Sequence, residues 1–542
     1  MKVGAHRRTG PSGLEALALW LSVAVLSSAL YCRAGDGAWP SVRCDAGGTA
    51  NQKAGARTVV NLSRYAVAWT AGTTNCAVAA ADIAGDARLE VVTTDPKGLH
   101  VYDCAGNPLW EKTGGSNWSP AVLADVDRDG KAEVFASFQA GSSSYTIKAW
   151  DGAGYELKKI DFTVDNEDLE LANVVDLESS GRHQLLCRLN SRQGNHRCGV
   201  WVFNYEAGTL GWDFEIGPRV NDIVCADFDN DGSQQIVLGV TADHLRNCLN
   251  RFDDFIAYVL CLSASGELRW WTGMGTWRTE PMLGDIYSEG RSALVAVRGQ
   301  EYYGGTVGAY VLNPETGAET AKWNGPAGYS AGGKALGHLR RGLGRQLVLG
   351  QQARGKWAGL RLFDSELHEL AMLSKTDEPS WVGAACDLDG DGLDEVLVLH
   401  RSSIAAYDGA LKCKWTFPLG AMPSPCIAVS DLGGIGQLEI LVPTSAGLKV
   451  LSAGAPTLKM AATGEVRQHF HYTLSADGAA PMTFEASPLP HGLRLQGATI
   501  SGIPDTPGST TVTITARNSL GSDSRTLLIT ITPQARPQTS AP

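Results

Sequence analysis

Short apolar runs alternate with acidic, glycine-containing turns over most of the chain. The clearest case has an apolar run at Val382–Cys386, an acidic loop at Asp387–Glu395 and a second apolar run at Val396–His400. Short runs of this kind, bounded by turn residues, are typical of buried β-strands. The pattern therefore predicts two strands joined by an acidic loop.

The strand, loop and strand pattern recurs along the chain. Two further well-kept copies begin at Asp125 and Asp227. Weaker copies begin at Asp82, Asp176, Asp285, His338 and Asp431. Successive copies start 43 to 58 residues apart, and a period in this range with strand-like content is typical of a β-propeller.

Further strand candidates follow each acidic loop. In the second unit they are residues 134–138, 145–151 and 155–160, and in the first unit they are 91–94, 99–102 and 109–112. With the strand before the loop, each unit has four antiparallel strands, which make one propeller blade. We predict an all-β propeller over residues 61–456, with eight blades, or seven if one weak copy is a distorted extra.

Tryptophans mark the last strand of many units. They follow glycine- or alanine-bearing turns and are Trp110, Trp212, Trp270, Trp323 and Trp415. A tryptophan at this place can lie between adjacent blades and bury a large apolar area. The segment Tyr65–Trp69 has the same pattern but precedes the first inner strand, so we expect it to complete the last blade and close the ring.

The acidic loops offer only oxygen ligands. In the loop that begins at Asp387, the candidate ligands at positions 1, 3, 5, 7 and 9 are Asp387, Asp389, Asp391, the Leu393 carbonyl and Glu395. The equivalent residues are Asp125, Asp127, Asp129, Lys131 (carbonyl) and Glu133, and Asp227, Asp229, Asp231 and Ser233 (carbonyl). Such ligands favour calcium over magnesium or zinc. We expect Ca²⁺ in about three loops, where it stabilises the turn between two inner strands.

The loop motif, D-x-[DN]-x-D-G-x-x-[DE], is matched in full at Asp125–Glu133 and Asp387–Glu395, and in all but its last position at Asp227–Gln235. The chain thereby resembles the FG-GAP or VCBS propeller repeats, the family that includes the integrin α-subunit head, over about residues 65–455. This resemblance implies calcium-loop blades. The tryptophan strands also resemble quinoprotein propellers, which implies their shape but not their redox activity, because the chain has no adjacent cysteine pair.

The pattern changes after the last repeat. Strands rich in Thr, Val and Ile, at Thr510–Ala516 and Arg525–Ile531, predict a small β-sandwich over residues 457–533. Leu489–Leu493 and Ile500–Pro504 make this part similar to the immunoglobulin-like, cadherin-like domain of many large secreted bacterial proteins. The tail, 534–542, is predicted to be disordered.

Residues 1–34 have the pattern of a secretory signal peptide. A basic start precedes the apolar run Ala16–Leu26 and the small residues Ser27–Ala29. The apolar run is too short to span a bilayer comfortably, and bulky Tyr31 argues against a lipid anchor on Cys32. With a linker at 35–60, these features predict a secreted or cell-surface protein without a membrane span.

The net charge limits the possible ligands, and the cysteine positions suggest disulfides and buried thiols. A net charge of -11 argues against nucleic-acid binding. Two cysteine pairs, Cys187 with Cys198 and Cys248 with Cys261, are candidate disulfides between neighbouring strands. Cys225 and Cys386 occupy inner-strand positions, where buried thiols are expected.

No catalytic set emerges from the sequence, and three functions stay open. The first is a non-catalytic, monomeric binding or adhesion protein for an extracellular glycan or a cell-surface protein. The second is a polysaccharide-degrading enzyme of the lyase type, and the third is a structural component of a cell-surface assembly. Fold alone does not choose among them.

Overall fold

The computed structural model describes residues 60–532, apart from 165–166, 192–196, 243–247, 276–277, 290–291, 300–305, 328, 354–355, 375–379, 435, 454–456, 460–461, 478–481 and 519–520. Within these residues the chain is all-β, and its one helical element is a single 3-10 turn, η1 (Leu62–Arg64). None of the described helical segments is long and apolar enough to cross a membrane. The predicted signal peptide, nearly all of the predicted linker and the predicted tail lie outside the described residues.

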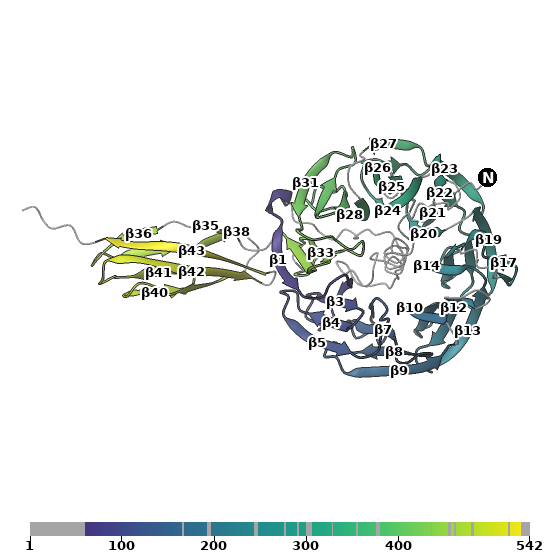
Figure 1. Cartoon of the computed structure of the whole chain (residues 1–542), viewed down its shortest axis with the longest axis horizontal. Helices are drawn as coiled ribbons and strands as arrows, with labels where there is room; N and C mark the ends of the chain where they lie inside the picture. The colour runs from purple at the N-terminus through teal and green to yellow at the C-terminus, as the bar shows by residue number, and fades with distance from the viewer. Residues whose placement is uncertain are drawn as a thin grey trace, which may run out of the picture.

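Four-stranded antiparallel sheets follow one another around a common centre (Figure 1). The first three are β2 (Ala77–Ala81), β3 (Glu90–Asp95), β4 (Gly98–Tyr102) and β5 (Pro108–Thr113); β6 (Val122–Ala124), β7 (Glu133–Gln139), β8 (Ser144–Trp150) and β9 (Glu156–Thr163); and β10 (Glu167–Val175), β11 (Gln184–Ser191), β12 (Cys198–Asn204) and β13 (Thr209–Ile216). The next two are β14 (Arg219–Ala226), β15 (Gln235–Thr241), β18 (Ala257–Leu262) and β19 (Leu268–Gly275); and β20 (Thr279–Gly284), β21 (Ala293–Arg298), β22 (Thr306–Leu312) and β23 (Glu319–Ala327). A small hairpin of β16 (Cys248–Leu249) and β17 (Phe252–Asp253) is inserted before β18.

The strands that follow form one larger sheet. Its members are β24 (Tyr329–Gly337), β25 (Gln346–Ala353), β26 (Lys356–Phe363), β27 (Glu369–Ser374), β28 (Ser380–Cys386), β29 (Glu395–His400), β30 (Ser403–Tyr407) and β31 (Cys413–Pro418). A parallel pairing at Gly333 and Val382 joins its two antiparallel halves. Dividing the sheet at this pair gives two units of four strands, which is the division that the eight-blade prediction requires.

The last propeller sheet combines strands from both ends of this region. It contains β32 (Ala428–Ser430), β33 (Glu439–Thr444), β34 (Gly447–Ser452) and β1 (Ala66–Ala71). β1 pairs antiparallel with β34, with Ala66 opposite Ser452 and Ala71 opposite Leu448. The prediction that the segment around Trp69 completes the last blade is therefore confirmed, and β34 is not left as an open edge.

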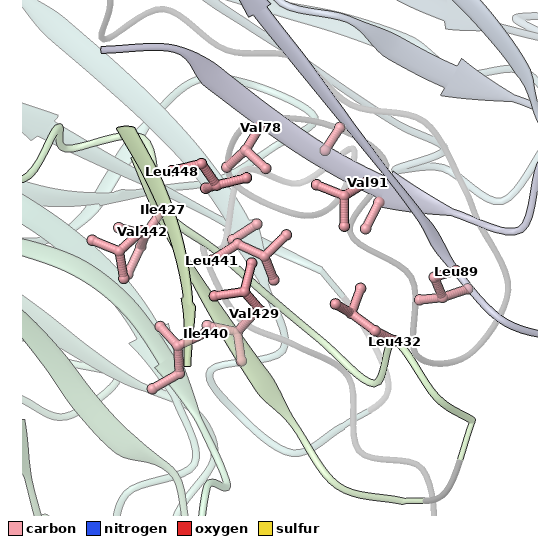
Figure 2. Packing of buried hydrophobic residues seen from close by; sticks show 14 of the residues in the cluster. Val78, Leu89, Val91, Ile427, Val429, Leu432, Ile440, Leu441, Val442 and Leu448 are labelled. Carbon is pink, nitrogen blue, oxygen red and sulfur yellow. The ribbon is translucent and has the colours of Figure 1, made fainter. Parts of the chain in front are cut away.

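The innermost strands carry the core. All five residues of β2 are buried, whereas the outer strand β5 alternates between exposed and half-buried positions. The innermost strand has neighbouring sheets on both of its faces, so both faces are apolar. Figure 2 shows Val78 and Val91 of the first sheet beside Val429, Leu441 and Leu448 of the last, which are part of one buried cluster.

The outer-strand tryptophans join neighbouring sheets. Trp110 Nε1 donates to the Gly152 carbonyl at 2.9 Å, and this carbonyl lies in the outer hairpin turn of the following sheet. Trp69, Trp212 and Trp270 make the same contact with the Cys104, Ala264 and Pro314 carbonyls at 3.0, 3.1 and 2.8 Å. These contacts confirm the predicted position between blades for Trp110, Trp212 and Trp270, and Trp69 makes the same contact across the closure of the ring.

The C-terminal part forms a sandwich, drawn beside β1 in Figure 1. One sheet has the order β36 (Ala462–Glu465), β43 (Gly521–Thr532), β42 (Gly508–Asn518) and β39 (Thr483–Ser487); the other has β37 (Phe470–Thr473), β41 (Thr499–Gly502) and β40 (Leu493–Gln496); and β35 (Thr457–Lys459) pairs with β38 (Ser475–Asp477). Phe470, Ile500, Val512, Ile514 and Ile529 belong to its core. The alternation of Thr with apolar residues places one side chain of each pair inside, as predicted.

The cysteine predictions have mixed outcomes. Cys187 is a free thiol and lies opposite Trp201 in the β11–β12 register, so it does not bridge to Cys198. Cys261 is likewise a free thiol, which rules out the bridge to Cys248. The error arose because proximity around a turn does not place two side chains opposite each other. Cys225 and Cys386 are both buried, as expected for their positions.

Candidate functional site

The three well-kept acidic loops occupy the same place in their sheets, between the first and second strands. We call them the Asp125 loop (Asp125–Glu133), the Asp227 loop (Asp227–Gln235) and the Asp387 loop (Asp387–Glu395). The fourth and sixth residues of each loop have left-handed backbone angles, for example φ of 65° at Arg128 and 89° at Gly130. Two left-handed residues so close together fold the loop tightly, and glycine has the lowest cost at such angles.

The first aspartate of each loop holds the turn by accepting main-chain hydrogen bonds. Asp387 accepts them from Gly390, Asp391 and Gly392 at 2.8 to 3.1 Å. Asp227 accepts from Asp231 and Gly232 at 3.1 and 3.0 Å. Asp125 Oδ2 accepts from the Gly130 amide at 3.1 Å, whereas its Oδ1 is buried and accepts no hydrogen bond from the described residues.

The ninth residue closes the loop, even in copies that lack most candidate ligands. One carboxylate oxygen of Glu133 accepts the Val126 amide at 2.9 Å. The equivalent contact from the second loop residue is made to Glu90, Gln184, Gln235, Gln346, Glu395 and Glu439 at 2.7 to 3.0 Å. The sequence interpretation missed this role, although a Glu or Gln eight residues after the loop start in seven of the eight copies could have revealed it; the copy at Asp285 has Ala293 there.

The structure brings part of each predicted ligand set together. Oxygens of Asp125, Asp127 and Glu133 lie within 4.8 Å of one another, as do those of Asp387, Asp389 and Glu395. In the Asp227 loop the group consists of Asp227, Asp229 and Asp231. Asp129 lies outside its group; its Oδ1 accepts the Lys131 amide at 2.8 Å and its Oδ2 lies 3.2 Å from Lys131 Nζ. Asp391 is also outside, with its Oδ1 2.8 Å from the Leu393 amide.

The buried glutamates of two loops have perturbed acidities. Burial, followed by the neighbouring carboxylates of Asp127 and Asp125, raises the pKa of Glu133 to about 7. Burial also raises the pKa of Glu395 to about 7, against the opposing effect of a hydrogen bond from Lys414. Both effects arise because a charged carboxylate is unfavourable away from water, and in Glu395 the nearby Lys414 offsets only part of this cost. A divalent cation among these oxygens would favour the charged form.

Two of the three loops contain a basic side chain from the outer strand of the same sheet. Lys414 Nζ contacts Asp389 and lies 2.8 Å from Glu395 Oε1 and 3.9 Å from Asp391 Oδ2. Arg269 donates to Asp229 Oδ2 at 2.9 Å. In that same loop the Gln235 amide nitrogen donates to Asp229 Oδ1 at 2.9 Å and to the Ser233 carbonyl at 3.0 Å. Predicted calcium ligands in these loops are thus already engaged.

A second candidate site is a pocket between the β2–β5 and β6–β9 sheets, which we call the inter-blade pocket. Its volume is about 280 Å³, and it is lined by Lys112, Thr113, Trp118, Phe138, Lys148, Trp150, Gly154 and Glu156. Trp118 precedes β6 and stacks on Phe138, with ring centroids 4.4 Å apart and planes inclined by 21°. The Trp150 ring lies 6.3 Å from the Trp118 ring at a similar inclination of 24°. The three rings form an aromatic wall whose accessible surface comes from the half-buried Trp118 and Phe138, because Trp150 is only 2% exposed.

Charged side chains stand beside this aromatic wall. Lys148 Nζ and Glu156 Oε2 form an ion pair at 2.6 Å. Lys112 Nζ lies over the Trp110 ring, 5.3 Å from its centroid, and has no carboxylate partner among the described residues. The sequence interpretation did not single out Trp118 or Lys112, because the pocket combines two sheets that are built from separate parts of the chain.

Comparisons with known proteins agree with the two-part architecture. A family model described as "Putative Ig domain" matches residues 455–532, which identifies the C-terminal sandwich as an Ig-like domain. No curated protein matches the chain by sequence.

Solved structures support the propeller fold. A europium-containing methanol dehydrogenase is similar with a TM-score of 0.53 and 12% identity, over 77% of this chain and 98% of that chain. Quinohemoprotein alcohol dehydrogenases from Pseudomonas putida and Comamonas testosteroni have TM-scores of 0.53 and 0.51 with 11% and 12% identity. They cover 77% and 78% of this chain, and 80% and 81% of their own lengths are covered. Identities this low show a shared fold, as the tryptophan strands predicted, and carry no information on activity.

Proposed function

We propose that this chain is a secreted, non-catalytic binding protein whose propeller holds an acidic carbohydrate in the inter-blade pocket. The observation that carries the proposal is the aromatic wall of Trp118, Phe138 and Trp150 beside Lys112 and Lys148. Ligand sites are mostly apolar and contain a small number of placed polar groups. A sugar ring has the same composition, since it presents C–H groups to an apolar wall and hydroxyl groups to polar side chains.

The lysines indicate the charge of the ligand. Lys148 is already balanced by Glu156, whereas Lys112 is not balanced by a carboxylate of the described residues. A sugar carboxylate would accept a charge-assisted hydrogen bond from Lys112, which is stronger than a bond between neutral groups. The preferred ligand is therefore a polysaccharide that contains uronic acid. The pocket volume of about 280 Å³ is just below the usual range of about 300 to 1,000 Å³, so the pocket would hold only a short segment of such a polysaccharide.

In this proposal calcium supports the propeller and takes no part in chemistry. The loop motif of the FG-GAP or VCBS repeats and the convergent carboxylates support calcium binding. Asp125 Oδ1 and Asp389 Oδ1 are both buried and accept no hydrogen bond from the described residues, so a cation would satisfy either. The Asp125 loop is the better candidate, because Lys414 contacts the acidic group of the Asp387 loop and no basic side chain of the described residues contacts that of the Asp125 loop. Sites in extracellular modules bind calcium at roughly 10⁻⁴ to 10⁻³ M, so the site would fill outside cells.

The test is retention of the mature protein on immobilised polysaccharides, with and without uronic acid, in calcium and in a chelator. We expect retention on uronate-containing glycans, with the glycan unchanged in length. Trp118→Ala and Lys112→Ala should each weaken retention about tenfold or more. The matched control is Trp271→Ala, because Trp271 is a 47% exposed tryptophan on β19 outside the pocket.

Other outcomes would contradict the proposal. Shortening of the retained glycan would favour the lyase alternative. An absence of retention on every glycan would leave a protein ligand or a structural component of a surface assembly. Near-ultraviolet circular dichroism of each variant separates loss of the pocket from loss of the fold.

A further inference from the structure

The outer strands share a β-bulge at one position, and its occupant differs among the three sheets with well-kept acidic loops. A bulge leaves one residue without a partner on the neighbouring strand. That residue is Lys414 in β31, Arg269 in β19 and Leu157 in β9. The flanking pairs are Tyr407 with Cys413 and Ala406 with Trp415; Leu262 with Leu268 and Cys261 with Trp270; and Trp150 with Glu156 and Ala149 with Lys158.

In the Asp387 loop the bulge residue supplies a cation. The Lys414 ammonium contacts Asp389, Glu395 and Asp391, which are three of the predicted calcium ligands at positions 3, 9 and 5 of the loop. The lysine is tethered to the same sheet, so its charge is present at a high local concentration and needs no metal in solution. A calcium ion could enter this group only if the ammonium left it.

In the Asp227 loop, two hydrogen-bond donors engage the predicted ligand Asp229. Arg269 takes one oxygen of Asp229, at 2.9 Å, and the Gln235 amide nitrogen takes the other, also at 2.9 Å. Gln235 therefore directs a hydrogen-bond donor at oxygens that would otherwise face a cation. At the ninth position the amide NH₂ group of Gln235 thus stands where the other two loops have a carboxylate oxygen, and an N–H donor repels a cation.

Among the described residues, the Asp125 loop has no such partner. Its bulge residue, Leu157, is uncharged and 49% exposed. Lys131, the loop's own lysine, pairs with Asp129 at 3.2 Å, outside the group of Asp125, Asp127 and Glu133. The convergent carboxylates of this loop are thus not neutralised by a basic side chain of the described residues.

We propose that the bulge residue selects which acidic loops bind a divalent cation. A basic bulge residue makes the loop independent of metal, and an apolar one leaves the loop to calcium where the ninth residue is a glutamate. The protein therefore holds one calcium ion, in the Asp125 loop, and not about three. This inference rests on the calcium part of the proposed function, and it makes no use of the inter-blade pocket.

The experiment exchanges the bulge residues in the full chain. Calcium stoichiometry is measured by calorimetric titration of metal-depleted protein, together with the shift of the melting temperature in about 1 mM calcium. We expect one bound ion for the unaltered chain, two for Lys414→Leu and none for Leu157→Lys. The control Lys414→Arg should keep one ion. Arg269→Leu should also keep one, because Gln235 still directs a donor into its loop.

The outcomes separate the selection rule from the calcium assignment. If the unaltered chain binds one ion and Lys414→Leu gains none, the rule is overturned and the calcium assignment stands. If the unaltered chain binds none and Lys414→Leu gains one, a basic bulge residue does exclude calcium, but an apolar one is not enough to bind it, and the assignment of calcium to the Asp125 loop is overturned. Three ions in the unaltered chain would overturn the rule. Leu157→Lys adds an ion pair between the new lysine and the Asp125 loop carboxylates, so the fold is not weakened. This variant therefore tests the rule even if Lys414→Leu fails to fold.

Discussion

Single residues of the acidic loops have two separable roles. Glu133 holds the loop through a carboxylate oxygen that accepts the Val126 amide, and the same carboxylate belongs to the acidic group. Gln235 makes the same loop contact with an amide oxygen. The hydrogen bond therefore needs an oxygen at the ninth position, while the negative charge matters only where a cation is bound.

Glu133→Gln tests this division through pH. A carboxyl group whose pKa rises on folding stabilises the fold below its unfolded pKa, near 4.5, and loses that contribution as the pH rises through its folded pKa, about 7. In chelator, the unaltered protein should lose stability on the order of 2 kcal/mol across this window through Glu133. Glu133→Gln should remove this part of the decrease of stability with pH, and it should also abolish calcium binding. Melting temperatures between about pH 5 and 8 measure it.

The control is Glu267→Gln, which changes an exposed carboxylate and should leave the slope unaltered. An unchanged slope in Glu133→Gln would show that Glu133 titrates normally in the fold.

At the scale of the element, glycine turns and tryptophan strands form a matched pair that spans two sheets. Gly266 has φ of 86°, and a Cβ atom there would lie 2.5 Å from the Trp212 ring of the preceding sheet. Gly106, Gly154 and Gly317 stand in the same relation to Trp69, Trp110 and Trp270. The glycine in the sequence signature thus accommodates the tryptophan of the previous blade, not the one that follows it in the sequence.

Gly266→Ala should therefore be costly for two reasons. The left-handed angle costs about 1–2 kcal/mol for alanine, and the overlap with Trp212 adds to it. Gly420→Ala is the matched control, since Gly420 has φ of 69° and a Cβ atom there would have no neighbouring atom within 4 Å. We expect Gly266→Ala to lower the propeller melting temperature clearly more than Gly420→Ala does. Equal shifts would mean that the tryptophan moves aside without cost.

At the scale of the whole molecule, the ring closes through a strand from the start of the described chain. β1 pairs with β34, and Trp69 donates to the Cys104 carbonyl at 3.0 Å, so one strand contacts both the last and the first sheet. Tyr65 adds a hydrogen bond from its hydroxyl group to the Leu438 carbonyl at 2.8 Å. Closure in this way covers an edge that would otherwise be free to pair with another chain.

Trp69→Ala should open this closure locally. We expect amide hydrogen exchange in β1 and β34 to rise at least tenfold. Without the Trp69 contact, β1 is held by its pairing with β34, and these two strands can separate while the other sheets stay folded. Trp110→Ala removes the same kind of contact between two sheets that are consecutive in sequence, and it should leave exchange in β1 and β34 unchanged. Equal exchange in both variants would show that β1 is held by strand pairing alone.

Local patterns determined much of this protein. The apolar runs, the turn residues and the repeat length predicted the strands, the acidic loops, the sandwich and the closing strand around Trp69, because each depends on residues close in sequence or on a repeated unit. The same patterns predicted Asp125, Asp127 and Glu133 as one group, and the structure brings their oxygens together.

The tertiary structure decided what each loop faces and what lies between sheets. Lys414 reaches Asp389 from 25 residues away, and it does so because a bulge places it opposite the loop, which no local pattern encodes. The inter-blade pocket likewise needs Lys112 and Trp150 from two different sheets. A sequence repeat fixes the contacts within a unit, whereas the register of strand pairing and the packing of neighbouring sheets fix those between distant residues.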